Sequence, residues 1–293
     1  MLNLESSDLR VLLLDPQADR ARLGSRYCVG GYIWQVEDLK KGNLLSGPVY
    51  PKPDPNPWDG QGMPEAFEIA LGQHRAKVGE DVWVIGVGKV KRESPVKPFH
   101  VRNNFTVTEF AKWKVDVERA PAAGAAAVVT MTSDQAFQEW GLQIIRKVSL
   151  KGRLVESATT VRNTGSVELP IRWFAHPFFP HAGLECFGFS GECCFPFWVS
   201  EGGGFRWNDR GYVERKAEYD WNKGCYQLVQ APFGFPMDVT QRHPLLGEVK
   251  IECRFPLAFL PIWANERTIS FEPYLQTSVL PGASYSWSMR YHF

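Results

Sequence analysis

Residues 142–174 read LQIIRKVSLKGRLVESATTVRNTGSVELPIRWF, and this stretch decides the expected fold class. Apolar and polar side chains alternate along residues 142–150 and again along residues 154–162, as they do on half-buried strands. Between the two runs, Lys151-Gly-Arg153 is short and contains the glycine that suits a tight turn. The pattern predicts two antiparallel strands joined as a hairpin.

The same alternation recurs before and after this hairpin. Asn163-Thr-Gly165 turns the chain into a third run, residues 168–174, which extends the hairpin to a meander. Residues 82–90 and residues 104–117 alternate as well, and we expect each of them to form one strand. The fold class that follows is all-β, a large antiparallel β-sandwich.

Helical periodicity is scarce, and residues 64–71 are the short stretch expected to form a helical turn. Residues 47–62 hold five prolines and form a long loop, which in a compact domain is usually functional. Gly202-Gly-Gly204 marks another loop. Neither a repeat nor a linker interrupts the chain, so we expect one domain spanning residues 1–293.

Composition excludes several classes of function. The 293 residues carry 33 lysines and arginines against 32 aspartates and glutamates, a net charge of +1. This balance argues against a nucleic-acid partner, which would require a basic surface. The longest apolar run, Phe255–Ala264, contains two prolines and is too short to span a bilayer. The start, residues 1–8, does not resemble a signal peptide, and the six cysteines lack a C-x-x-C spacing, so we expect a cytoplasmic protein with reduced thiols.

Two segments carry candidate catalytic groups. His176 ends an apolar run and precedes Pro177, a position from which an imidazole can point into a cleft. A histidine packed in the core fits equally well, and a metal site with His181 is a further alternative. Glu272 lies before Pro273 between aromatic residues, where partial desolvation would raise the pKa of its carboxyl toward that of a useful base. A solvent-exposed edge-strand glutamate is the alternative interpretation.

Together these motifs resemble the aldose 1-epimerase (galactose mutarotase) family. Its members carry an asparagine–glycine turn and then a strand that ends in histidine–proline–aromatic–phenylalanine, as in Arg162–Pro170 and Trp173-Phe-Ala-His-Pro-Phe-Phe179. Phe271-Glu-Pro-Tyr274 and the closing residues 279–293 are similar to that family's late glutamate and last strands. Val29-Gly-Gly-Tyr-Ile33, followed by the Asn43–Pro48 loop, is similar to its opening.

The resemblance implies a β-supersandwich with a sugar cleft and a mutarotation mechanism. Glu272 would be the base that takes the anomeric proton, and His176 the acid that protonates the ring oxygen. A sugar-binding aspartate of the family matches Asp220, which a turn paired with Asn222 would explain as well. Trp58, Asp59 and Trp173 are the further candidates for substrate binding, since aromatic faces stack on sugars, although core packing is the alternative for each tryptophan.

The sequence also departs from the family. Its asparagine–arginine pair and its histidine–glycine–phenylalanine motif are both missing, and Arg75, His74 or Glu65 are the substitutes offered by position. Lys89, Lys91 and Arg92 form a weak candidate for binding a sugar phosphate. A catalytically silent carbohydrate-binding or regulatory protein therefore stays open, as does another isomerase or lyase reaction with the same two groups. We expect a carbohydrate small molecule as ligand, no cofactor, no metal, and neither nucleic acid nor membrane as partner; the oligomeric state is left open.

Overall fold

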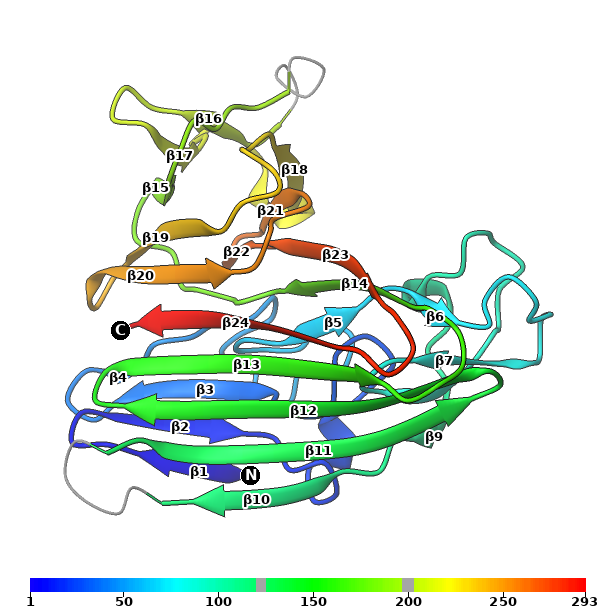
Figure 1. Cartoon of the computed structure of the whole chain (residues 1–293). Helices are drawn as coiled ribbons and strands as arrows, with labels where there is room; N and C mark the ends of the chain where they lie inside the picture. The colour runs from blue at the N-terminus through cyan, green and yellow to red at the C-terminus, as the bar shows by residue number, and fades with distance from the viewer. Residues whose placement is uncertain (120–124, 197–202) are drawn as a thin grey trace.

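The computed structural model describes residues 1–119, 125–196 and 203–293 (Figure 1), so Gly202 of the expected glycine loop lies outside the described residues. Strands dominate these residues. The helices among them are three single 3-10 turns: η1 (Arg20–Arg22), η2 (Val101–Asn103) and η3 (Trp221–Lys223). Within the described ranges, no helix has the length and apolar character needed to cross a membrane.

The largest sheet has ten antiparallel strands, in the order β10-β11-β12-β13-β24-β20-β19-β15-β17-β16. Its strands are β10 (Lys114–Glu118), β11 (Ala127–Phe137), β12 (Trp140–Lys151), β13 (Leu154–Asn163), β24 (Ser284–His292), β20 (Gly247–Arg254), β19 (Met237–His243), β15 (Glu185–Phe189), β17 (Tyr212–Arg215) and β16 (Phe205–Trp207). The β12–β13 hairpin is the one expected from residues 142–162, and Gly152 in its turn adopts a φ of 57°, which favours glycine.

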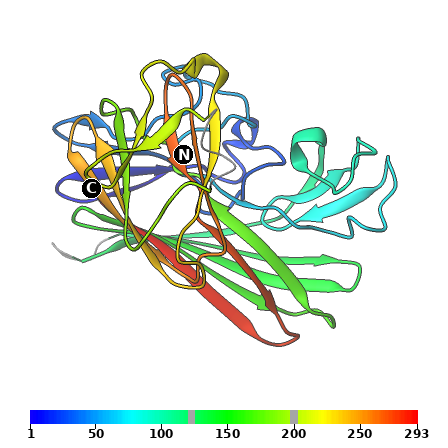
Figure 2. The ribbon, with the colours of Figure 1, turned by 90° about the horizontal axis from the view of Figure 1, so that it is seen from above.

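Four smaller antiparallel sheets complete the architecture. They are β1-β2-β3-β4 (Leu2–Glu5, Leu9–Leu13, Ile33–Asp38, Gly42–Asn43), β23-β14-β5 (Tyr274–Val279, Leu169–Ala175, Glu65–Phe67), β18-β21-β22 (Cys225–Val229, Leu260–Ala264, Ile269–Phe271) and β6-β7-β8-β9 (Ala70–Leu71, Asp81–Val84, Gly88–Lys91, Val107–Phe110). Strand β1 contacts β11 and β12, so the N-terminal sheet covers one face of the large sheet. Figure 2 shows this blue sheet beside the long green and red strands, with the cyan β6–β9 sheet set apart.

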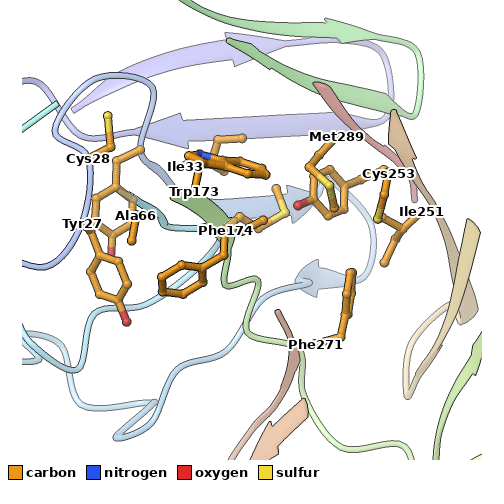
Figure 3. Close-up of a cluster of buried hydrophobic side chains, with 14 of the residues drawn as sticks. Tyr27, Cys28, Ile33, Ala66, Trp173, Phe174, Ile251, Cys253, Phe271 and Met289 are labelled. Carbon is orange, nitrogen blue, oxygen red and sulfur yellow. The ribbon is translucent and has the colours of Figure 1, made fainter. Parts of the chain in front are cut away.

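Side chains that alternate along these strands fill the space between the sheets. The burial of β11 and β13 alternates residue by residue, as the period of a strand requires. Their inward side chains join one large apolar cluster, part of which Figure 3 shows around Trp173, Ile33 and Met289. A second, smaller cluster lies within the β6–β9 sheet. The all-β antiparallel architecture expected from the sequence is therefore confirmed.

Four expected elements differ from the structure. Residues 82–90 form the hairpin β7–β8 instead of one strand, because the chain turns at Gly86, whose φ is 78°. Residues 104–117 are divided between β9 and β10, which belong to different sheets. Residues 64–71 contain the short strands β5 and β6 in place of a helical turn. The third run of the expected meander, β14, pairs with β23 and β5, while β13 pairs with β24.

Candidate active site

The pairing of β14 with β23 brings the two candidate catalytic side chains together. The register of this antiparallel pair ends with Phe174 opposite Tyr274, and their rings stack at a centroid distance of 4.6 Å. His176 lies two residues after Phe174, and Glu272 lies two residues before Tyr274. Because side chains two apart share a face, the same register places His176 and Glu272 opposite each other on that face.

Backbone hydrogen bonds hold both residues beyond the ends of their strands. The His176 N–H donates to the Pro64 carbonyl at 2.8 Å, and the Glu272 N–H donates to the Pro261 carbonyl at 2.8 Å. The residue that follows each of them is a proline, which has no N–H to continue sheet pairing. The histidine–proline and glutamate–proline motifs therefore mark the point where strands end at a cavity.

An open cavity of about 630 Å³ lies over this pair. Its size falls in the range of about 300–1,000 Å³ usual for small-molecule sites. The walls combine aromatic rings with charged groups: Arg26, Pro48, Trp58, Asp59, Ala66, Phe67, Glu68, His100, Val101, Arg102, Phe174, His176, Phe178, Tyr226, Trp263, Glu272 and Tyr274.

The imidazole of His176 is fixed on both of its nitrogens. Its Nε2 lies 3.5 Å from Oε1 of Glu272, and its Nδ1 lies 2.7 Å from Oγ of Ser270. The Ser270 hydroxyl donates to the Phe271 carbonyl at 3.3 Å, which leaves its oxygen to accept from Nδ1–H. That assignment turns the lone pair of Nε2 toward Glu272. Both side chains are almost fully buried, with 3% of His176 and 6% of Glu272 exposed.

Burial shifts the pKa of the two groups in opposite directions. Desolvation lowers the pKa of His176 well below its ordinary value, and the nearby positive charge of Arg26 lowers it further. Desolvation raises the pKa of Glu272 to about 7, while Arg26 opposes that rise. In each case the apolar walls penalise the charged form. Below about pH 7 the pair therefore holds one proton, which the carboxyl of Glu272 retains more strongly than the imidazole does.

Arg26 is one of two arginines that line the cavity, and the sequence analysis did not identify it. Its guanidinium lies over the rings of Tyr27 and Trp58, at 4.7 and 4.5 Å from the ring centroids, and donates to the Trp58 carbonyl at 3.0 Å. Among the described residues, no carboxylate lies within ion-pair distance of Arg26. Its charge therefore acts on Glu272 and on whatever the cavity binds. No motif in the sequence signals this role, because Arg26 precedes Val29-Gly-Gly-Tyr-Ile33, the first stretch that resembles the family.

Two further cavity residues were also missed. His100 accepts the Arg102 backbone N–H on Nδ1 at 3.1 Å, which leaves Nε2–H as a donor. Glu68 is held by Tyr274, whose hydroxyl donates to it at 2.9 Å, and by Arg172 at 3.0 Å. These groups come from loops and strand ends far apart in sequence, so only the fold reveals that they meet.

Of the expected substrate-binding residues, Trp58 and Asp59 line the cavity. Asn56 orders this part of the proline-rich loop, since its side-chain oxygen accepts the backbone N–H groups of both residues at 3.0 and 2.9 Å. Trp58 also packs edge-on against Phe105 at 5.7 Å. The long loop therefore reaches the cavity that holds His176 and Glu272.

Trp173 and Asp220 lie elsewhere, and for them the expectation needs correction. Trp173 is 1% exposed and donates its Nε1–H to Glu65 at 3.0 Å within the core, among the side chains that Figure 3 shows. Alternation along β14 turns it away from the face that carries His176. Asp220 does not line the cavity: it accepts the Asn222 N–H at the start of η3 and pairs with Lys223 at 3.4 Å. Asp220 thus has the turn role that the sequence left open.

The substitutes offered for the missing arginine and histidine also lie outside the cavity. Arg75 pairs with Glu139, and Glu65 is buried in an ion pair with Arg146. His181, the alternative partner of His176 in a metal site, contacts the Asn265 carbonyl at 2.9 Å. Within the described ranges, no group of three or more histidine, cysteine, aspartate or glutamate side chains is arranged to hold a metal ion.

Solved structures share this fold over almost the whole chain. A galactose mutarotase related enzyme from Lactobacillus acidophilus superimposes with a TM-score of 0.58 at 11% identity, covering 99% of this chain and 96% of that one. A galactose mutarotase-like protein from Clostridium acetobutylicum gives 0.58 at 14% identity, covering 99% and 93%. An aldose epimerase homologue from C. elegans gives 0.50 at 8% identity, covering 99% and 97%.

The fold is galactose mutarotase-like. No family profile and no curated protein matches the sequence, so the likeness is one of structure. The large antiparallel sheets of the mutarotase-like fold are those described above, and the likeness extends over nearly the full length of both chains.

Proposed function

We propose that the protein is an aldose 1-epimerase-like enzyme that interconverts the anomers of a free sugar or sugar derivative. The observation that carries the proposal is the His176–Glu272 pair, set 3.5 Å apart in a cavity of about 630 Å³. An acid and a base that serve one pyranose ring must both lie within hydrogen-bond reach of it. The neighbours named as mutarotase or epimerase proteins support the same reaction class, through the fold alone.

The reaction needs one proton from the pair and returns it. Glu272, as carboxylate, takes the proton of the anomeric hydroxyl while His176, as imidazolium, protonates the ring oxygen. The bond between C1 and the ring oxygen breaks, and the open-chain aldehyde rotates about C1–C2. The ring oxygen then attacks the other face of the carbonyl and its proton returns to His176, while Glu272 protonates the carbonyl oxygen, which becomes the new anomeric hydroxyl. The pair ends with the same single proton.

The protonation of the pair sets the pH range of activity. With two protons on the pair there is no base, and with none there is no acid. Since the pKa of Glu272 is raised to about 7 and that of His176 is lowered, the one-proton form predominates below about pH 7. Within that form, the reactive arrangement places the proton on His176. The charge of Arg26 acts on both groups, because it stabilises the carboxylate of Glu272 and disfavours the imidazolium of His176.

The remaining cavity groups suit a sugar. Arg26 and the free Nε2–H of His100 are donors for sugar hydroxyls, and Asp59 is an acceptor. Trp58 offers an apolar ring to the C–H face of a pyranose. In this proposal Arg26 and His100 take the positioning roles of the arginine and histidine whose motifs the sequence lacks. That assignment removes the main reason to favour a catalytically silent sugar-binding protein.

Anomer exchange followed by NMR, across a panel of aldoses and aldose phosphates, tests the proposal. We expect acceleration for at least one sugar, and its loss in Glu272→Gln and in His176→Gln. The matched control is Glu252→Gln, because His292 and Glu252 form a similar contact at 3.1 Å far from the cavity. A sugar that binds without faster exchange would identify a silent binding protein, and the appearance of new products would identify another reaction.

A further inference from the structure

A second cavity, of about 600 Å³, adjoins the candidate active site. The two cavities share the side chains of Arg26 and Trp58, which form the wall between them. The second cavity is mainly apolar, and its ring-bearing walls are Trp58, Phe105 and Phe110. It contains neither of the groups assigned to catalysis. Because the two cavities share a wall, a single ligand can extend from the first into the second.

Phe105 is the feature that core packing does not explain. Its side chain is 57% exposed, yet its backbone is fixed, because the Glu93 carboxylate accepts the Phe105 N–H at 2.7 Å. Glu93 also accepts the Thr106 hydroxyl at 2.6 Å, and Asn104 accepts the Glu93 N–H at 2.7 Å. The backbone that carries this exposed ring is thus held in place, and the ring itself packs edge-on against Trp58 at 5.7 Å. Such a ring can bind a ligand with little loss of conformational entropy.

The geometry points to a second sugar ring as this occupant. Aromatic rings offer a flat apolar surface to the C–H face of a pyranose, and Trp58 and Phe105 present two ring surfaces set at 83°. Arg26, which lines both cavities, can donate hydrogen bonds to hydroxyls on either side of the wall. An apolar wall with a few polar donors is the usual composition of a small-molecule site.

The chemistry of mutarotation fixes which sugar can extend this way. Ring opening requires a free hydroxyl at C1, so the ring at His176 and Glu272 must be a reducing end. A second ring can therefore be attached only through one of the other hydroxyls of the first ring. We propose that the preferred substrate is a reducing disaccharide or longer oligosaccharide, with its second ring against Trp58 and Phe105. This inference rests on the proposed function and names its substrate class.

The test compares glucose with maltose, cellobiose and lactose, which all end in a reducing glucose. For each sugar, the dissociation constant and the rate of anomer exchange are both measured by NMR. We expect at least one disaccharide to bind about tenfold more tightly than glucose, the gain that one stacked ring provides. In Phe105→Ala that advantage should fall to about threefold or less. Phe235→Ala removes a ring that is 66% exposed and lies away from both cavities, and this variant should keep the advantage.

The outcomes separate the two proposals. If no disaccharide binds more tightly than glucose, or if the advantage survives Phe105→Ala, the second subsite is refuted, even when glucose anomers exchange rapidly. If the Phe105-dependent advantage is found in binding but no sugar exchanges faster, the subsite stands and the enzymatic proposal fails. If none of the four sugars binds, the second subsite is refuted, and the wider panel of aldoses and aldose phosphates decides the proposed function. Because Phe105 is exposed and only its side chain is shortened, a thermal melt should show Phe105→Ala folded like the wild type.

Discussion

Replacing Glu272 by Gln should make the protein more stable at alkaline pH. Burial raises the pKa of Glu272 to about 7 in the folded protein, against the ordinary 4.5 of an exposed glutamate. A group whose folded pKa is raised contributes stability that is complete below the unfolded pKa and is lost as pH rises through the folded pKa. The wild type therefore loses stability from about pH 4.5 to about pH 7, and Gln, which does not ionise, removes that loss.

The size of the effect follows from the two pKa values. Each unit of difference corresponds to ~1.4 kcal/mol, so a difference of about 2.5 units gives ~3 kcal/mol between the acidic and alkaline limits. Part of this is already lost at about pH 5, which leaves about 2–3 kcal/mol between about pH 5 and about pH 9. Chemical denaturation of both proteins at several pH values measures the difference. It should grow with pH in favour of Glu272→Gln.

Glu252→Gln provides the matched control. Desolvation alone would raise the pKa of the Glu252 carboxyl, but the hydrogen bond from Arg254 and nearby positive charges outweigh it and lower the pKa. The stability that Glu252 contributes is therefore lost only as pH falls through that lowered value. Between about pH 5 and about pH 9 its effect on unfolding free energy should stay constant to within ~0.5 kcal/mol. A difference between wild type and Glu272→Gln that is equally flat would refute the raised pKa of Glu272 and the protonation scheme built on it.

Three further perturbations follow from the same contacts. Arg26→Gln should raise the pKa of Glu272, which moves the alkaline limit of anomer exchange to higher pH, and should weaken sugar binding. An unchanged alkaline limit would show that the charge of Arg26 does not affect the pKa of Glu272. Arg146→Met leaves Glu65 buried without its partner and should cost about 3–5 kcal/mol in unfolding free energy, part of which the added change Glu65→Gln should restore in denaturant titrations. Asp220→Asn should leave the sugar dissociation constant unchanged within twofold, because Asp220 lies in a turn outside the cavity; a larger change would return it to the site.

The sequence predicted those secondary-structure elements that depend only on neighbouring residues. The β12–β13 hairpin follows from alternation on both sides of a short turn with glycine at a positive φ. The same alternation was misleading in residues 82–90, because a period of two cannot show where a strand turns back. It was misleading in residues 104–117 for a related reason. There the chain leaves one sheet and enters another, which depends on contacts with distant strands.

In the candidate site, sequence motifs identified two residues but did not show that they lie close together in the fold. His176 and Glu272 were singled out because each follows an apolar strand and precedes a proline. Their proximity depends on the register of β14 against β23, which is set by packing across the chain. Strand alternation alone separates Trp173 from His176, since residues three apart on a strand point to opposite faces. Arg26 carries no comparable signal, because a positioning arginine needs only to reach the cavity, from any loop.

The pH profile of catalysed anomer exchange tests the central claim most directly, that His176 and Glu272 act on a sugar as a pair sharing one proton. The measurement is kcat/KM by NMR exchange for the best sugar of the panel, from about pH 5 to about pH 9. The account predicts a decline above about pH 7, tenfold for each pH unit, as Glu272 loses the shared proton. A rate that keeps rising through that range, as a lone ionised carboxylate base would give, contradicts the account.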